Sequence, residues 1–364
     1  MHFIFVESFD RPDWNGQTSR FTKGVSGSHG GPMYLAEGLA KLGHKVDFVS
    51  IFNFMKETTY MGVNYINYEN FQNTSCDYII GTNQTLDFII LNKINSVKKI
   101  ILIMHNDLFF QENKSFFNIN KEFILISYLN EFSKMNIENA QPFLKEYENC
   151  ILPNSIDLTD VRPFDISKKE NSLCFFACVG RGLHMATEVV NRLDNFILYS
   201  NTYADEHRYL TNSNNKLIQT DGCSKLDIFR YLVKSKYFVY PLIDMENNMI
   251  HYDTFGYVVL EALLHGVIVI APKIAVYEEL YGDSICYVDT DGIIPEEDLL
   301  YWKKTNANAN FGFPLLGRYL DKINELENDE ELRRSYIEKG VEVGKKYSNV
   351  EITNMLIEII NINR

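Results

Sequence analysis

Residues 237–272, YFVYPLIDMENNMIHYDTFGYVVLEALLHGVIVIAP, decide the fold of this chain. Two apolar runs, 237–242 and 267–271, have the length and composition of buried strands, and a helix is expected between them from about Thr254 to Gly266. A strand, a helix and a second strand in this order predict a βαβ unit, the usual connection between parallel strands. The chain is therefore expected to contain a parallel sheet covered by helices.

The predicted helix carries two carboxylates and a set of backbone amides at its start. Asp253 lies just before it, and Glu261 lies about 12 Å further along an unbroken helix axis. Phe255, Gly256 and Tyr257 fall in the expected first turn, where free N–H groups and the helix dipole favour an anion such as a diphosphate. This arrangement suits a nucleotide-sugar. The simpler interpretation is a capping Asp253 and a solvated Glu261, although a carboxylate in so apolar a helix requires a partner.

The segment DTFGYVVLEALLHGVIVIA, residues 253–271, resembles the E-x7-E signature of the retaining GT-B glycosyltransferases of the GT4 type, usually written EPFGxxxxEAMAxGxPVI. Asp253 stands at the first glutamate of that signature, Thr254 at a common proline, and Glu261 at the second glutamate. The resemblance implies that Glu261 holds the ribose hydroxyls of the donor and that Asp253 contacts the transferred sugar. An aspartate is one methylene shorter than a glutamate, so the geometry at Asp253 is expected to differ from that of the family.

Composition limits the class of protein. The chain has 364 residues, of which 46% are hydrophobic and 23% charged, enough for two globular domains. The net charge of −13 and the lack of a basic run argue against a nucleic-acid partner. No stretch approaches the roughly 18 apolar residues of a transmembrane helix, and no basic region marks the N-terminus for export. We expect a cytoplasmic protein without a transmembrane segment, and the sequence leaves its oligomeric state open.

A glycine-rich stretch precedes the first helix. Residues 2–6 and 45–52 are predicted strands, and Pro32 lies in the first turn of the helix between them. The glycines follow the first strand too late for a dinucleotide-binding fingerprint, whose glycines come immediately after the strand. Gly30 and Gly31 are therefore candidates for a phosphate or acceptor contact, as the resemblance to GT4-type enzymes implies. The alternative, flexible glycines at a helix start, is equally consistent with the sequence.

Further strands are expected at 77–82, 98–106 and 122–127, with helical patterns between them. His105 ends the second of these strands, at the edge where open α/β sheets bind ligands. A single histidine is more often structural than functional. The resemblance favours function here, because family members often carry a histidine at the end of this strand, near the donor sugar.

The segment CILPNSIDLTDVRP, residues 150–163, resembles the linker between the two domains of the same family. Its turn-forming residues are assigned to hinge structure and not to chemistry. The predicted N-terminal domain, on the acceptor side, is 1–153 together with the C-terminal helix 348–364, which by resemblance packs back on it. The predicted donor domain is 154–347.

Arg181 is the candidate cation for the donor diphosphate. It follows the expected strand 172–180, where it would meet a phosphate held before the next helix. The alternative is an exposed surface arginine. In the family a lysine follows this arginine and also meets the phosphates, whereas GRGLHMATEV contains no lysine. We expect His184, or an arginine or lysine distant in sequence, to replace it, or donor binding to be weaker.

The prediction is an α/β chain of the GT-B fold, with two Rossmann-like domains whose parallel sheets face each other across a cleft. By resemblance it is a retaining hexosyl- or pentosyltransferase that moves a sugar from a nucleotide-sugar to a hydroxyl of a glycan, lipid or small-molecule acceptor. Asp253 and His105 would be catalytic, and Arg181 with the amides near Phe255 and Gly256 would stabilise the leaving diphosphate. No metal or other cofactor is expected. The alternatives are a non-catalytic protein that binds sugar nucleotides or glycans and, less favoured, a nucleotide-sugar epimerase.

Overall fold

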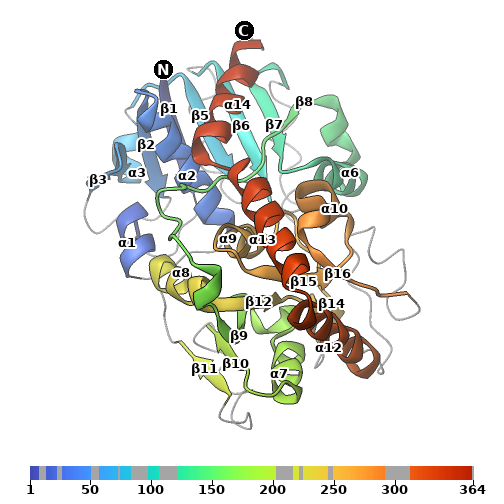
Figure 1. Cartoon of the computed structure of the whole chain (residues 1–364). Helices are drawn as coiled ribbons and strands as arrows, with labels where there is room; N and C mark the ends of the chain where they lie inside the picture. The colour runs from blue at the N-terminus through green and yellow to red at the C-terminus, as the bar shows by residue number, and fades with distance from the viewer. Residues whose placement is uncertain are drawn as a thin grey trace. The chain divides into compact units, whose positions relative to one another are not determined.

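The computed structural model describes residues 1–7, 14–22, 27–50, 57–72, 74–82, 97–105, 121–201, 216–220, 224–244, 249–291 and 312–362 (Figure 1). The contacts divide the chain into an N-terminal unit, Met1–Leu158 with Tyr347–Arg364, and a C-terminal unit, Thr159–Lys346. Within the linker, the backbone N–H of Ile156 donates to the Tyr347 carbonyl, at 2.9 Å. This contact ties the start of the linker to the N-terminal unit.

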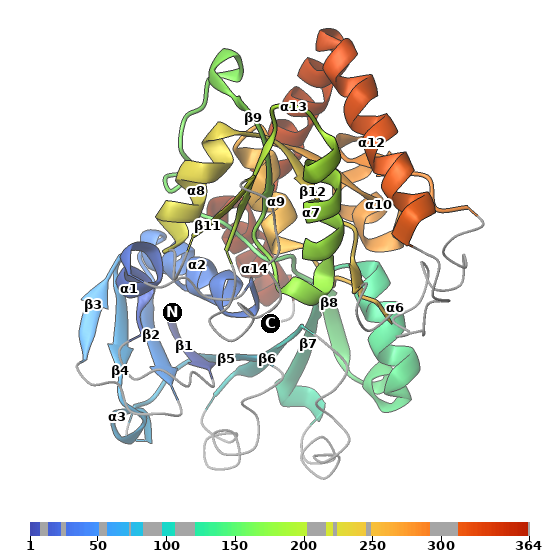
Figure 2. The same ribbon diagram turned by 90° about the horizontal axis from the view of Figure 1, so that it is seen from below.

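The N-terminal unit is built on one eight-stranded sheet of order β3-β4-β2-β1-β5-β6-β7-β8, which Figure 2 shows in sequence across the unit. All neighbouring strands are parallel except β3 and β4, which form an antiparallel hairpin. Its central strands are buried along nearly their whole length, as a sheet covered on both faces requires. The strands are His2–Glu7 (β1), Lys45–Ser50 (β2), Thr58–Tyr60 (β3), Val63–Ile66 (β4), Tyr78–Thr82 (β5), Lys99–Met104 (β6), Ile124–Tyr128 (β7) and Glu148–Ile151 (β8).

The last helix of the chain belongs to this unit and packs on its second helix. Gly38 on α2 allows the close approach, because a Cβ there would lie 2.1 Å from the Thr353 Oγ1 of α14. The described helices of the unit are Gly16–Phe21 (α1), Gly27–Lys41 (α2), Tyr68–Gln72 (α3), Glu131–Ala140 (α6) and Asn349–Ile362 (α14).

The C-terminal unit has a six-stranded sheet of order β11-β10-β9-β12-β15-β16, in which every neighbouring pair is parallel. The predicted βαβ unit is its centre, formed by β12, the helix Tyr257–Leu264 (α9) and β15. A short antiparallel pair, β13 with β14, precedes α9. The strands are Glu170–Phe175 (β9), Ile197–Ser200 (β10), Leu217–Gln219 (β11), Ser235–Val239 (β12), Ile243–Asp244 (β13), Met249–Ile250 (β14), Ile268–Pro272 (β15) and Cys286–Val288 (β16).

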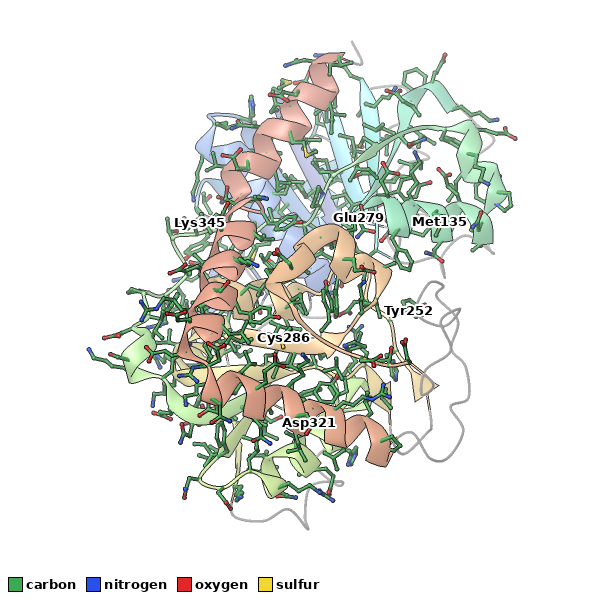
Figure 3. The ribbon with its side chains drawn as sticks, turned by 45° about the vertical axis from the view of Figure 1, so that its right-hand side comes forward. Met135, Tyr252, Glu279, Cys286, Asp321 and Lys345 are labelled. Carbon is green, nitrogen blue, oxygen red and sulfur yellow. The ribbon has the colours of Figure 1, made fainter. Side chains whose placement is uncertain are left out.

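Two long helices, α12 and α13, pack against this unit. α13 comes close to α9 because Gly340 and Gly344 face its leucines; a Cβ at either glycine would lie 2.8 Å from a leucine side chain. Figure 3 marks exposed Asp321 on α12, exposed Lys345 at the end of α13 and buried Cys286 on β16. The described helices are Leu183–Arg192 (α7), Lys225–Lys234 (α8), Tyr257–Leu264 (α9), Ala275–Tyr281 (α10), Gly312–Asn328 (α12) and Glu330–Lys345 (α13).

Candidate active site

A cluster of polar side chains lies at the carboxyl edge of the six-stranded sheet. Arg181, in the short turn after β9, forms an ion pair with Asp253, which precedes α9, and donates a 2.8 Å hydrogen bond to the Tyr240 hydroxyl at the end of β12. The Tyr277 hydroxyl on α10 donates to the other oxygen of Asp253, at 2.6 Å. Both oxygens of Asp253 are therefore held, and the structure brings together two residues that the sequence suggested separately.

The protonation states in this cluster follow from burial. Tyr277 is completely buried, and burial raises its pKa well above 10, with the neighbouring Tyr240 acting in the same direction. Tyr277 is therefore a neutral hydroxyl that donates to Asp253. Arg181 keeps 31% of its side chain exposed whereas Asp253 keeps 6%. Arg181 is thus the most exposed side chain of the cluster.

The start of α9 differs from the sequence prediction. The helix begins at Tyr257 and not near Thr254, and Gly256 is its N-cap in the left-handed conformation, with φ of 70°. This conformation favours glycine, and a Cβ at Gly256 would also lie 2.9 Å from the Tyr277 ring. Phe255 and Gly256 therefore precede the first turn that they were expected to form, and the estimate of about 12 Å between the two carboxylates, which assumed an unbroken helix, does not apply.

The backbone before α9 is fixed from α10. The Tyr281 hydroxyl donates to the carbonyl of Phe255 at 2.8 Å and reaches that of Gly256 at 3.3 Å. The Phe255 side chain is buried and packs edge-on against the Tyr281 ring, with 6.2 Å between ring centroids. These contacts set the position of the chain that carries Asp253.

Glu261 is buried in the middle of α9, as its apolar flanks suggested, and its partner is Lys225, the first residue of α8. The Lys225 ammonium also lies 4.4 Å from the centroid of the Tyr257 ring. Burial raises the pKa of Glu261, and Lys225 acts in the opposite direction. Lys225 was not singled out from the sequence; the available signal was a lysine directly after the capping Ser224, where the helix dipole disfavours a cation.

His105 in the N-terminal unit directly follows β6 and is 7% exposed. Burial, and secondarily His29, lower its pKa to about 3, so the imidazole is neutral near pH 7. Among the described residues its Nε2 has no hydrogen-bond partner. His29 Nε2 on α2 lies 3.9 Å from a carboxylate oxygen of Glu7, the last residue of β1. Glu7 and His29 were not singled out from the sequence, because only the sheet order brings the ends of β1 and β6 to one edge.

Gly30 and Gly31 are buried in the first turns of α2. Gly31 has a packing role: a Cβ there would lie 2.1 Å from the Asn154 Oδ1, so glycine lets the linker pass close to the helix. The structure thus supplies a structural reason for this glycine. A ligand contact at either glycine stays a prediction.

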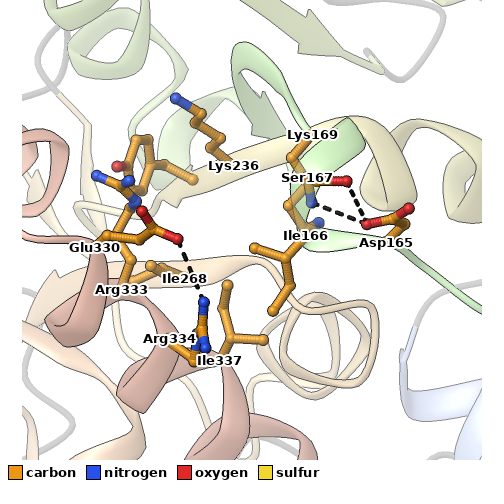
Figure 4. Close-up of a pocket in the computed structure, with 11 residues that line it drawn as sticks. Asp165, Ile166, Ser167, Lys169, Lys236, Ile268, Glu330, Arg333, Arg334 and Ile337 are labelled. Carbon is orange, nitrogen blue, oxygen red and sulfur yellow. Dashed lines mark hydrogen bonds and ion pairs between the residues drawn. The ribbon is translucent and has the colours of Figure 1, made fainter.

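A separate cavity of about 420 Å³ lies at the opposite, amino edge of the six-stranded sheet (Figure 4). Its lining includes Lys169, Lys236 and Ile268, and none of the predicted site residues. The Lys169 ammonium donates to backbone carbonyls at the ends of α8 and α9, at 2.8 Å from Ser235 O and 3.0 Å from His265 O. Its amine is therefore used to hold helix ends.

In the described part of the chain, no group of three or more His, Cys, Asp and Glu side chains is arranged to hold a metal ion. None of the described helices is both long and apolar enough to cross a bilayer.

Comparison with known proteins identifies the fold. No family model and no curated protein sequence matches the chain. Among solved structures, HepE from Anabaena in complex with UDP-glucose is 12% identical, with a TM-score of 0.70 and 99% of each chain covered. Sucrose-phosphate synthase from Thermosynechococcus elongatus is also 12% identical, with a TM-score of 0.64, and covers 99% of this chain and 98% of its own.

The catalytic domain of starch synthase IV from Arabidopsis thaliana, bound to ADP and acarbose, gives a similar result. It is 12% identical with a TM-score of 0.63, and the match covers 100% of this chain and 99% of that one. Identities this low establish the fold alone. The chain therefore has the GT-B fold of glycosyltransferases, with two α/β units built on parallel sheets, as the sequence predicted.

Proposed function

We propose that this protein is a retaining glycosyltransferase that transfers a sugar from a nucleotide-sugar to a hydroxyl group of a glycan, lipid or small-molecule acceptor. The observation that carries the proposal is the cluster of Arg181, Asp253 and Tyr277 at the carboxyl edge of the donor-side sheet, within a chain of GT-B fold. The bound UDP-glucose of the Anabaena HepE structure supports a nucleotide-sugar as the donor. We further propose a cytoplasmic location.

Each residue has a defined role in this proposal. Negative charge grows on the departing diphosphate as the bond to the anomeric carbon breaks, and Arg181, the most exposed member of the cluster, would stabilise it. Asp253, oriented by Tyr277, would accept hydrogen bonds from hydroxyls of the transferred sugar. Glu261 would accept those of the ribose. His105, a neutral imidazole, would contact a hydroxyl of the sugar or the acceptor.

A guanidinium in this position supplies the positive charge that a metal provides in other transferases, so we propose that transfer does not require one. The first test is a thermal-shift panel of UDP-, GDP- and ADP-sugars, each with and without a divalent metal. A ligand at 100 times its dissociation constant stabilises the folded state by about 2.7 kcal/mol, which is a rise of a few degrees. A selective, metal-independent rise is expected. If no nucleotide-sugar raises the melting temperature, the proposed function is wrong.

A non-catalytic protein that binds sugar nucleotides is the second candidate. It is favoured by the ion pair between Arg181 and Asp253, which ties two functional groups to each other, and by the absence of a lysine from GRGLHM. The two candidates differ in turnover of the donor identified by the panel. A transferase hydrolyses that donor slowly and transfers its sugar in an acceptor screen, whereas a binding protein leaves it intact.

Substitution of the two carboxylates tests their separate roles. Glu261→Gln is expected to weaken nucleotide binding, because an amide offers the ribose diol one acceptor oxygen and not two. Asp253→Asn is expected to reduce transfer by about tenfold or more with a smaller effect on nucleotide affinity, since hydrogen bonds to a charged group contribute about 1.5–3 kcal/mol. Transfer at the parental rate by both variants would contradict the assignment.

A further inference from the structure

The ion pair between Lys225 and Glu261 joins α8 to α9 in the interior of the C-terminal unit. The two residues are 4% and 5% exposed, and the Lys225 Nζ contacts the Glu261 Oε1. The ammonium also lies over the face of the Tyr257 ring, at 4.4 Å from its centroid. A lysine with this degree of burial is uncommon and calls for an explanation.

Stability alone does not explain this lysine. Lys225 is the first residue of α8, where the positive end of the helix dipole opposes a cation. Burying both charges costs solvation energy, and buried ion pairs are often no more stabilising than apolar residues of similar volume. The Lys225 position is therefore unfavourable both for a helix and for a core.

The carboxylate that Lys225 contacts has acceptor capacity left. In the part of the chain that the structure describes, the contact with the Lys225 ammonium is the one side-chain interaction recorded at the Glu261 Oε1. An ionised carboxylate has about four lone-pair sites. A buried carboxylate with free acceptor sites suits a ligand that brings hydroxyl donors to it.

We propose that Lys225 is a positioning residue, which holds Glu261 as an oriented acceptor for the two neighbouring hydroxyls of a nucleotide ribose. This inference rests on the proposed function, because it takes the nucleotide as the ligand of Glu261. Lys225 is thus not proposed to bind the diphosphate in place of the lysine that follows the arginine in the GT4-type family. Lys225 acts on the ligand only through Glu261.

If Lys225 positions Glu261, the affinity for the nucleotide should depend on pH through the pKa of Glu261. The charged groups whose fields reach Glu261 in the described structure are Lys225, which lowers the pKa of Glu261, and Asp160, which raises it together with burial. Without Lys225, the pKa of Glu261 rises further. A protonated Glu261 accepts fewer hydrogen bonds, so nucleotide affinity falls as the pH drops through this pKa.

The experiment is a titration of the parent and of Lys225→Met with the nucleoside diphosphate of the donor that the thermal-shift panel identifies, by calorimetry from pH 5 to pH 8. We expect about tenfold weaker binding by Lys225→Met at pH 7, since hydrogen bonds to a charged group are among the stronger ones. We also expect the pH of half-maximal affinity to be higher than in the parent. Adding Glu261→Gln should remove this pH dependence.

Lys236 provides a matched control within the same unit. It too pairs with a glutamate, Glu327, at 3.0 Å and lies 5.8 Å from the ring centroid of Phe196. Lys236→Met should leave both the affinity and its pH dependence as in the parent. Should Lys225→Met fail to fold, Lys225→Gln is compared in its place, because its amide still donates to Glu261 while the charge is lost.

The outcomes separate this inference from the proposed function. If the parent binds no nucleotide, the proposed function fails. If the parent binds and the neutral Lys225 variants show the parental affinity and pH profile, the inference about Lys225 is wrong. An equal loss of affinity at every pH would also overturn it, because a purely structural role predicts that result.

Discussion

Each unit of the chain contains an arginine paired with a carboxylate among tyrosines, and the two pairs differ in exposure. In the N-terminal unit, Arg20 on α1 binds both oxygens of Glu37 on α2, each at 2.7 Å, and their side chains are 2% and 0% exposed. In the C-terminal unit, Arg181 contacts Asp253 through one nitrogen and stays 31% exposed. The same two side-chain types therefore form a closed pair in one place and an open pair in the other.

The tyrosines around the closed pair and around the open pair also differ in how they contact the arginine and the carboxylate. Tyr34 and Tyr60 place their rings 5.0 and 5.5 Å from the Arg20 guanidinium and shield it. Tyr240 and Tyr277 instead use their hydroxyl groups, one as the acceptor from Arg181 and the other as a donor to Asp253. Rings enclose the first pair, whereas hydroxyls contact the second, whose arginine is partly exposed. Breaking the first pair is therefore expected to lower stability, and breaking the second to weaken ligand binding.

The largest effect is expected at the closed pair. Arg20→Met leaves the Glu37 carboxylate buried without its cation, and breaking a buried pair in this way costs about 3–5 kcal/mol. Denaturant unfolding of the variant measures this loss, while nucleotide affinity should match that of the parent. The control is Arg334→Met, which removes an exposed pair with Glu330 at 3.3 Å and should change stability by less than about 0.5 kcal/mol. Equal stabilities of the two variants would contradict a stabilising role for the Arg20–Glu37 contact.

The open pair should show the reverse pattern. Arg181→Met is expected to weaken nucleoside-diphosphate binding by about 100-fold, which corresponds to about 2.7 kcal/mol from the loss of charged hydrogen bonds. The loss of stability should be smaller than for Arg20→Met, because Tyr277 still donates to Asp253 and Arg181 is partly exposed. Calorimetric titration and unfolding of the same sample measure both quantities. A variant that unfolds easily but binds nucleotide normally would make Arg181 a structural residue.

The parts of the fold that sequence predicted are those with strong local patterns. The apolar runs predicted β1, β2, β5, β6 and β7 of one sheet and β9, β12 and β15 of the other, but not β8 or β16. The stretch 237–272 gave β12, α9 and β15 in their correct order. The hairpin of β3 and β4 was missed, because its strands are short and only half-buried. The start of α9 was placed too early, since the left-handed conformation of Gly256 is fixed by contacts with α10 that no local pattern reports.

In the candidate site, too, sequence patterns identified single residues but not their contacts with residues distant in the chain. Asp253, Glu261 and Arg181 could be selected because they match a motif, but their partners come from other elements of the fold. Tyr277 lies 24 residues after Asp253 in the chain, and Lys225 is contributed by a different helix from Glu261. Sequence spacing on one helix cannot reveal such contacts. They arise only when strand order brings separate loops to one edge of the sheet.

The smallest effect is expected at Tyr277. Tyr277→Phe removes one hydrogen bond to Asp253 and keeps the ring that packs near Gly256, so the orientation of the carboxylate is loosened without a cavity. One such bond contributes about 1 kcal/mol, and transfer should fall by about fivefold while nucleotide affinity stays unchanged. Steady-state kinetics with the donor varied would show the loss mainly in kcat.

Tyr281→Phe is the matched control for this last change. Its hydroxyl donates to the carbonyl of Phe255, at 2.8 Å, and not to a carboxylate, so its loss acts on the backbone before α9. If the hydroxyls of the open pair serve to orient Asp253, Tyr277→Phe should reduce transfer more than Tyr281→Phe does, at similar stability. Equal transfer rates would mean that the Tyr277 hydroxyl has no specific role in orienting Asp253. The difference between open and closed pairs would then rest on exposure and not on the tyrosine hydroxyls.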